Sequence, residues 1–161
     1  MTSRARVLGH AAHPMLIVFP LGLLATAVVF DVLAMTLDEP TFAVVAYWMI
    51  VAGIVGGVVA AIPGWIDYFA IPADTRAKRI GLVHGLGNTV VLALFVASWL
   101  LRRGEPESPD TLALVLGFAG AGLSLVTGWL GGELVDRLGV GVDDGAHLDA
   151  PNSLSGRPAR S

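Results

Sequence analysis

Four long apolar stretches constrain the fold of this chain more than any other feature of its sequence. They cover residues 15–37, 42–69, 80–101 and 112–135. A helix needs about 20 apolar residues to cross the hydrocarbon core of a bilayer, and every stretch is at least that long. We therefore predict an all-α protein, a four-helix transmembrane bundle over residues 15–142.

Composition and length agree with a chain that is solvated by lipid. Of its 161 residues 55% are apolar and only 14% are charged, whereas soluble domains carry about 25% charged residues. The net charge of −3 gives no reason to expect a nucleic acid as partner. Residues 1–14 form a short N-terminal segment, and the polar residues 143–161 are predicted to be a disordered tail.

The orientation follows from the positions of lysine and arginine. Short connections make consecutive helices antiparallel neighbours. Eight of the ten basic residues then lie on one side of the membrane, and only Arg102 and Arg103 lie on the other. Because positively charged loops stay in the cytoplasm, we expect both termini inside the plasma membrane of a bacterium.

Polar side chains converge at the cytoplasmic end of the predicted bundle. Odd-numbered helices run outward and even-numbered helices run inward, so residues at helix starts and helix ends share one layer. Each of the four helices contributes to it. The residues are His10, His13, Trp65, Asp67, His84, Asn88, Trp129 and Glu133. Ionisable groups at membrane depth usually face the bundle interior and have a function, so this layer is the candidate site.

The same layer indicates an internal repeat. The first hairpin opens with His13 and ends in Gly64-Trp65, and the second carries His84 and ends in Gly128-Trp129. Both hairpins begin on the same side, so the bundle is predicted to consist of two similar antiparallel hairpins in a parallel pseudo-repeat. Such a repeat would bring two histidines and two acids face to face.

Simpler interpretations exist for several of these residues. Tryptophans at helix ends commonly form interfacial belts, which would account for Trp65 and Trp129. Asp67 and Glu133 are also where the chain meets water. Asp31 lies near the outer end of the first helix, and we expect its carboxylate to reach water there.

Prolines and glycines add two further expectations. Pro20 and Pro63 should bend the first and second helices, because each removes a ladder hydrogen bond. Glycine pairs at four-residue spacing, such as Gly81 and Gly85, indicate close helix packing. They would alternatively leave clearance for a flat cofactor.

The residue types favour a nitrogen-ligated cofactor. The chain has no cysteine, which excludes disulfides and cysteine-ligated iron–sulfur clusters within it. A haem b with His13 and His84 as axial ligands is one interpretation, with Asn88, Trp65 and Trp129 around it. A non-haem iron, zinc or manganese ion is the variant, and a chain without cofactor is the third alternative. The ligands of the ion would be His13, His84, Asp67, Glu133 and His10.

Two motifs resemble those of a known family. They are residues 13–20, His-Pro-Met-Leu-Ile-Val-Phe-Pro, and residues 128–135, Gly-Trp-Leu-Gly-Gly-Glu-Leu-Val, the latter followed by Gly139-Val140-Gly141-Val142. Up to about Val142 the chain resembles the bacterial DUF2231 family of four-helix membrane proteins. The resemblance implies a histidine in the third helix, where His84 and Asn88 stand. Many relatives also carry a histidine before the phenylalanine of the first motif, a position that Val18 holds here. Some relatives are fused to Rieske-type domains, which points to electron transfer.

The sequence is compatible with three functions. The first is an electron-transfer protein that meets a redox partner protein at the cytoplasmic end. The second is a structural or accessory membrane subunit without cofactor. The third is a small proton-coupled transporter in which Asp67 or Glu133 titrates, and four helices would then require a homo-oligomer. The chain has no Gly-x-Ser-x-Gly, His-Glu-x-x-His or phosphate-loop motif, so we do not expect an enzyme.

Overall fold

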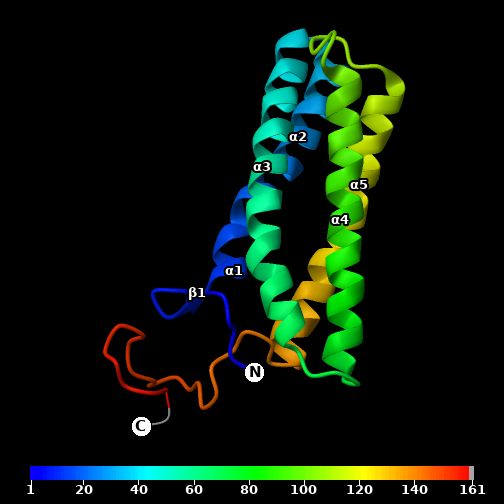
Figure 1. Ribbon diagram of the computed structural model, residues 1–161. Coiled ribbons are helices and arrows are strands. Elements are labelled where there is room, and N and C mark those ends of the chain that lie inside the picture. Colours follow the sequence, from blue (N-terminus) through cyan, green and yellow to red (C-terminus); the bar gives the residue numbers. More distant parts are fainter. Residues whose placement is uncertain (160–161) are drawn as a thin grey trace.

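The computed structural model describes residues 1–159 and is dominated by long helices (Figure 1). The elements in chain order are β1 (Arg6–Val7), β2 (His10–Ala11), α1 (Ala12–Leu16), α2 (Val18–Leu37), α3 (Pro40–Ala70), α4 (Arg76–Arg102), α5 (Thr111–Gly132) and the π-helical turn η1 (Glu133–Arg137). Four helical stretches in this part of the chain are long and apolar enough to span a membrane: Ala12–Leu37, Pro40–Ala70, Arg76–Arg102 and Thr111–Arg137. The predicted all-α bundle of four transmembrane helices is therefore confirmed.

Polar caps set where the helices begin. The Thr75 hydroxyl accepts a hydrogen bond from Lys78 N at 3.1 Å, and the Asp110 carboxylate accepts one from Ala113 N at 2.7 Å. Such side chains satisfy amide groups that have no partner within the first turn. They explain why α4 begins four residues before the apolar stretch that predicted it. No predicted helix end differs from the observed one by more than those four residues.

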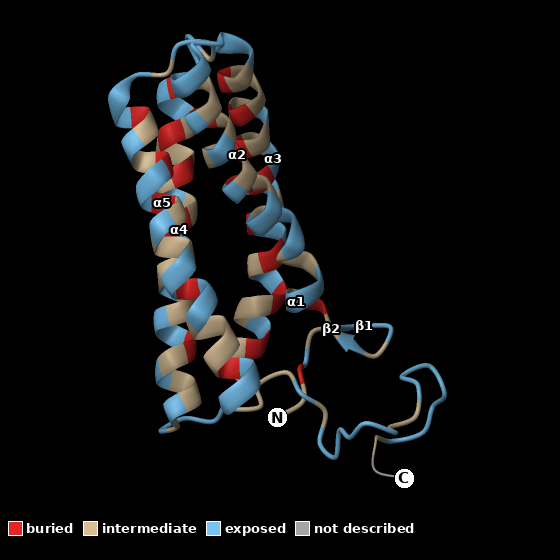
Figure 2. Cartoon of the chain, turned by 180° about the vertical axis from the view of Figure 1, so that it is seen from behind, coloured by how far each residue is buried: buried red, intermediate tan, exposed pale blue. Residues whose placement is uncertain are grey.

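The helices form two antiparallel hairpins that pack side by side. The first joins α2 to α3, the second joins α4 to α5, and α3 packs against α4 between them (Figures 1 and 2). The N-terminal segment and the C-terminal residues 138–159 lie at one end of the bundle, which we call the terminal end. The opposite end, which holds the turns at residues 38–39 and 103–110, is the turn end. The observed pairing agrees with two hairpins, while the predicted repeat and orientation stay predictions.

The apolar core lies between the two hairpins and depends on small residues for its density. Its buried members are Leu24, Ala27, Ala46, Ile50, Val91 and Phe95. A Cβ on Gly57 would lie 2.5 Å from Leu92 Cδ2, and a Cβ on Gly120 would lie 2.9 Å from Phe95 Cε2. These glycines therefore serve close packing between backbones and side chains. Most of the large apolar residues that remain exposed belong to the four long helices, as expected for a bundle surrounded by lipid (Figure 2).

Pro20 lies one turn after the junction of α1 and α2. Proline has no N–H, so it cannot donate the ladder hydrogen bond to the carbonyl four residues earlier. The two segments meet at Ile17, which still donates to His13 O at 3.1 Å and accepts from Leu21 N at 3.0 Å. The short α1, which carries His13, therefore stays hydrogen-bonded to α2. Pro63, in contrast, lies within α3, which continues to Ala70.

A short β-hairpin precedes α1, which the sequence did not indicate. Arg6 pairs with Ala11 and Val7 with His10. The connecting residues Leu8 and Gly9 have φ values of 50° and 85°. Positive φ at both positions is typical of the type I′ turn, whose twist matches that of two antiparallel strands.

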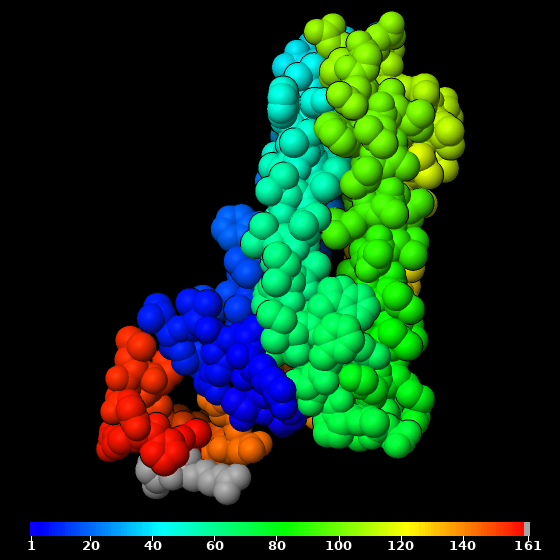
Figure 3. Space-filling model, in the orientation of Figure 1, coloured from blue at the N-terminus to red at the C-terminus, as the bar shows by residue number. Residues whose placement is uncertain are grey.

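The C-terminal segment lies against this hairpin at the terminal end (Figure 3). Residues 138–159 contain no helix or strand, and they are mostly exposed. Asp143 accepts two hydrogen bonds from the Arg6 guanidinium, at 2.7 and 3.0 Å, and the Ser153 hydroxyl donates to Leu8 O at 3.2 Å. Residues 160–161 of the predicted tail lie outside the described residues, and its disorder stays a prediction.

Candidate functional site

Two histidines from different hairpins face one another at the terminal end. His13 belongs to α1 and His84 to α4. Their ring centroids are 6.2 Å apart, and the ring planes are nearly perpendicular, at 89°. Both side chains are only partly buried. This juxtaposition of the two hairpins is the centre of the candidate site.

The His13 ring is fixed by the neighbouring helix α3. Its Nδ1 lies 2.8 Å from Ala60 O. A carbonyl oxygen only accepts hydrogen bonds, so Nδ1 must carry the proton. Neutral His13 therefore presents a lone pair at Nε2. Gly64 makes this approach possible, because a Cβ there would lie 2.9 Å from Nδ1.

The His84 ring is fixed in the same manner by α5. Its Nδ1 lies 2.8 Å from Thr127 O, so its neutral form also presents Nε2 as the acceptor. A Cβ on Gly131 would lie 3.1 Å from His84 Cε1. Gly128, which the sequence paired with Gly64, has no neighbouring atom within 4 Å of such a Cβ. A repeat drawn through these contacts pairs Gly64 with Gly131.

Asn88 and Thr127 hold the second histidine further. The Asn88 Nδ2 donates to His84 O at 2.9 Å and lies 3.3 Å from His84 Nε2. The Thr127 hydroxyl donates to Asn88 Oδ1 at 3.0 Å, which assigns the orientation of the amide. Thr127 is 2% exposed, so this contact is inside the bundle. The predicted pairing of Asn88 with His84 on one helix face is thus observed.

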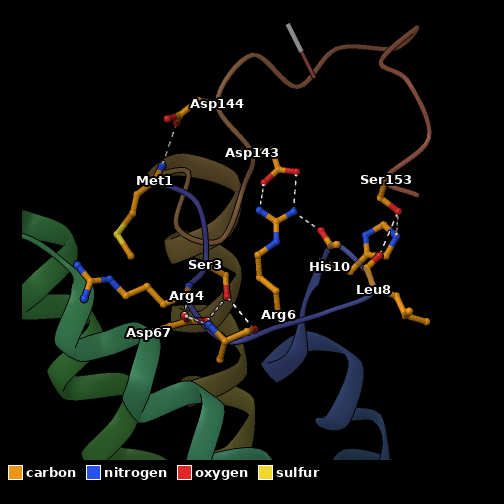
Figure 4. Close-up of polar contacts among 12 residues, drawn as sticks. Met1, Ser3, Arg4, Arg6, Leu8, His10, Asp67, Asp143, Asp144 and Ser153 are labelled. Atoms are coloured by element: carbon orange, nitrogen blue, oxygen red, sulfur yellow. Dashed lines mark hydrogen bonds and ion pairs between the residues drawn. The ribbon is translucent and has the colours of Figure 1, made fainter. Parts of the chain in front are cut away.

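Asp67 lies on α3 one turn beyond Gly64, but its carboxylate faces the N-terminal segment. One oxygen accepts from the Ser3 hydroxyl at 2.6 Å, and the other accepts from Arg4 N at 2.7 Å and Ala5 N at 3.1 Å (Figure 4). Both oxygens of the carboxylate therefore anchor residues 3–5 to the end of α3.

The other predicted metal ligands also have partners of their own. Glu133 forms an ion pair with Arg76 at 2.6 Å, which connects η1 to the start of α4. His10 is exposed in β2, and its Nε2 lies 3.3 Å from the Ser153 hydroxyl (Figure 4). No group of three or more His, Asp or Glu side chains that could hold a metal ion occurs within residues 1–159. Of the predicted ligand set, only His13 and His84 are brought together.

The two tryptophans of the predicted site have different surroundings. Trp65 packs on Gly85, where a Cβ would lie 3.2 Å from Trp65 Cη2, and its ring centroid is 5.3 Å from that of Tyr68. Tyr68 in turn fills the space at Gly81. Trp129 is 67% exposed on α5, as an interfacial residue would be. Aromatic rings thus occupy the clearance that the sequence suggested for a flat cofactor.

The structure contains a second polar contact, at the turn end, that the sequence analysis did not predict. Asp31 is 1% exposed and Arg102 is 0% exposed, and their side chains form a bidentate ion pair at 2.6 and 2.8 Å. The Arg102 Nε also donates to the Ser98 hydroxyl at 3.2 Å. The expectation that Asp31 reaches water was therefore wrong. The helix predicted over residues 80–101 stops one residue short of Arg102, whereas Arg102 ends α4 and its side chain is buried in the bundle.

One comparison with known proteins identifies a family. The model of the family described as "Predicted membrane protein (DUF2231)" matches residues 9–144. Neither a curated protein nor a solved structure matches the chain. The matched residues include both histidines, all four spanning helices and η1. The chain is therefore a multi-pass membrane protein that belongs to the DUF2231 family.

Proposed function

With membership of the DUF2231 family as the premise, we propose that this membrane protein is an electron carrier. Its cofactor, a haem b or a metal ion, would be held by His13 and His84 at the terminal end, on the cytoplasmic side. The observation that carries the proposal is the pair of neighbouring imidazoles, each anchored through Nδ1 to a backbone carbonyl, so that each neutral ring carries its lone pair on Nε2.

The anchoring supports a ligand role. Histidines that bind metals usually donate their other ring N–H to a carbonyl or carboxylate, which fixes the tautomer and the ring orientation. Ala60 O and Thr127 O take this part for His13 and His84. A metal bonded to one nitrogen of each ring at about 2.0–2.1 Å would place the ring centroids roughly 5–6.5 Å apart. The observed 6.2 Å lies in this range.

A metal ion fits the surroundings with less rearrangement than a haem does. A haem needs a flat space between the two rings, and Trp65 and Tyr68 pack against Gly85 and Gly81 beside the site. These two side chains would have to turn away to admit the macrocycle. A metal ion is much smaller than a macrocycle and would not require these two side chains to move.

The position of the pair suits exchange of electrons with a partner protein. His13 follows the exposed β-hairpin directly, and His84 lies within the first three turns of α4. A redox partner that docks at the terminal end would therefore come close to the cofactor without entering the membrane.

The accessory-subunit function is favoured by one specific observation. Asp67, Glu133 and Asn88 all have partners within the chain, as do both histidine Nδ1 atoms. A layer that is satisfied in this way can serve helix packing alone. The two functions differ in whether the Nε2 atoms bind anything.

Absorption spectra together with metal analysis test the proposal. The full-length protein is purified in mild detergent from cells with adequate haem and metal supply, and oxidised and dithionite-reduced spectra are recorded. We expect a haem signature or a stoichiometric metal that His13→Ala and His84→Ala abolish. The matched control is His10→Ala, which removes an exposed histidine and should change nothing. A folded wild-type protein without haem or metal would overturn the proposal in favour of an accessory subunit.

A further inference from the structure

The chemistry of the histidine pair narrows the choice of cofactor. We propose that His13 and His84 bind a single copper(I) ion between their two Nε2 atoms. This inference rests on the proposed function in taking the same two ligands. It goes further by naming the ion, and it concerns the reduced, univalent state alone.

The first argument is the number and charge of the donors. The site offers two neutral nitrogens, while the nearest predicted carboxylates are engaged by the N-terminal segment and by Arg76. Zinc normally takes four ligands, and iron and manganese favour additional oxygen ligands. A divalent ion at the membrane boundary without an anionic ligand would also carry an uncompensated charge into a region of low dielectric constant.

Copper(I) meets these conditions. It carries one charge and is stable with two ligands in a line. Sulfur ligands select copper(I) most strongly, and imidazole also binds copper. Two ligands in a line also place the ring centroids near the upper end of the range for metal-bridged imidazoles, where the observed 6.2 Å lies. Each ring can rotate about its nitrogen–metal bond, so the perpendicular planes cause no strain.

The second argument is that the rings are held in advance. Gly64 and Gly131 contact the two imidazoles closely, and Ala60 O and Thr127 O bind the Nδ1 atoms. A site with few ligands depends on such preorganisation, because the ligands do not have to be ordered when the ion arrives. The two hairpins thus form the two halves of the site.

Asn88 acts as a positioning residue in this arrangement. Its Nδ2 donates to His84 O at 2.9 Å and lies near His84 Nε2 at 3.3 Å, which is a long hydrogen bond. When Nε2 binds the ion in place of the amide, Asn88 Nδ2 keeps its shorter hydrogen bond to His84 O. Release of His84 Nε2 therefore leaves no buried donor unpaired.

Anaerobic titration with copper(I) against a chromophoric copper(I) chelator tests the inference on the full-length protein in detergent. We expect one ion per chain, and X-ray absorption at the copper edge should show two nitrogen ligands. His13→Asn and His84→Asn are the decisive variants, since an asparagine amide can still donate to Ala60 O or Thr127 O but has no second ring nitrogen. They should weaken copper(I) binding by more than about 100-fold, because even loss of an outer hydrogen-bond partner costs a metal site about 10–100-fold. His10→Asn is the control and should bind as the wild type does.

The possible failures are distinguishable. If copper(I) does not bind, or binds equally well to the two asparagine variants, the copper inference is overturned. The electron-carrier proposal would still stand if the wild type carried a haem or another metal that His84→Asn abolished. If the folded wild type bound neither copper(I), haem nor any other metal, both proposals would be overturned together.

Discussion

The two ends of the bundle join the same two hairpins in opposite ways. At the turn end Asp31 and Arg102 meet as opposite charges, and each completes the hydrogen bonds of the other. At the terminal end His13 and His84 meet as identical groups, with no hydrogen bond between them. The charges of the ion pair neutralise one another, whereas the histidine contact leaves the Nε2 atom of each ring without a hydrogen bond to the other ring. We infer that the turn end stabilises the fold, whereas the terminal end has capacity to bind.

The largest effect on stability is expected from breaking the ion pair between Asp31 and Arg102. Arg102→Ala leaves the buried carboxylate of Asp31 without its partner, which costs about 3–5 kcal/mol of folding free energy. Chemical or thermal unfolding in detergent measures this loss. The double variant Asp31→Leu/Arg102→Met should recover most of the stability, because apolar side chains can replace a buried pair. If the double variant is as unstable as the single one, the pair is not the source of the effect.

Arg103→Ala is the matched control at the same end. Arg103 is exposed, and its guanidinium lies 5.3 Å from the Trp99 ring centroid. An exposed cation–π contact contributes about 0.5–1 kcal/mol, so the change should be several-fold smaller than that of Arg102→Ala.

The contact between His13 and His84 should be disrupted by a single methyl group added at Gly64. Gly64→Ala would place Cβ 2.9 Å from His13 Nδ1, which forces the ring away from Ala60 O. We expect a loss of about 1–3 kcal/mol in stability from overpacking, together with loss of cofactor binding. Gly128→Ala is the control, since nothing lies within 4 Å of its Cβ. Equal effects of the two substitutions would contradict the assignment of Gly64 to the histidine site.

Asp67→Asn separates anchoring from ligation. The substitution removes the charge that accepts from the Ser3 hydroxyl and from two backbone N–H groups, Arg4 N and Ala5 N. Hydrogen bonds to a charged group contribute about 1.5–3 kcal/mol each, so residues 3–5 should become accessible to protease and to hydrogen exchange. Cofactor content should stay that of the wild type. A loss of cofactor with an intact N-terminal segment would instead make Asp67 a ligand.

The smallest effect is expected at the exposed contact between the two terminal segments. The hydrogen bonds from Arg6 hold the pKa of Asp143 below its usual value. A carboxyl group whose pKa is lower in the folded state stabilises the fold above its unfolded pKa of about 3.9, and this contribution is lost as the pH falls through the folded pKa. Hydrogen exchange of the segment around Asp143 should therefore accelerate on acidification below about pH 4. In Asp143→Asn this pH dependence should be absent, and its persistence would assign it to another group.

The sequence was informative wherever lipid or chain direction decided the structure. Apolar length predicted the four helices, and the alternation of their directions placed His13, His84 and Asn88 in one layer. The partners of the acids could not be predicted, because Asp67 is bound by residues 3–5, an irregular segment without periodicity. Which glycine contacts His84 depends on helix rotation, and the Gly-Trp motif does not determine that rotation.

The sequence does contain a signal that predicts the ion pair at the turn end. Asp31 and Arg102 have opposite charges, and both lie near the turn end of helices that run in the same direction. Matching depth on α2 and α4 would have paired them, since a charge in a membrane usually has a partner. The apolar stretch over residues 80–101 ends one residue before Arg102, so apolar length alone does not place Arg102 on the helix.

The proposed cofactor site depends on the pair formed by His13 and His84. The most direct test is the cofactor content per chain of three folded proteins prepared in parallel with haem and copper supplied: the wild type, His84→Asn and His10→Asn. We expect one cofactor per chain in the wild type and in His10→Asn, and none in His84→Asn. Equal content in all three proteins, or a folded wild type that binds nothing, would contradict it.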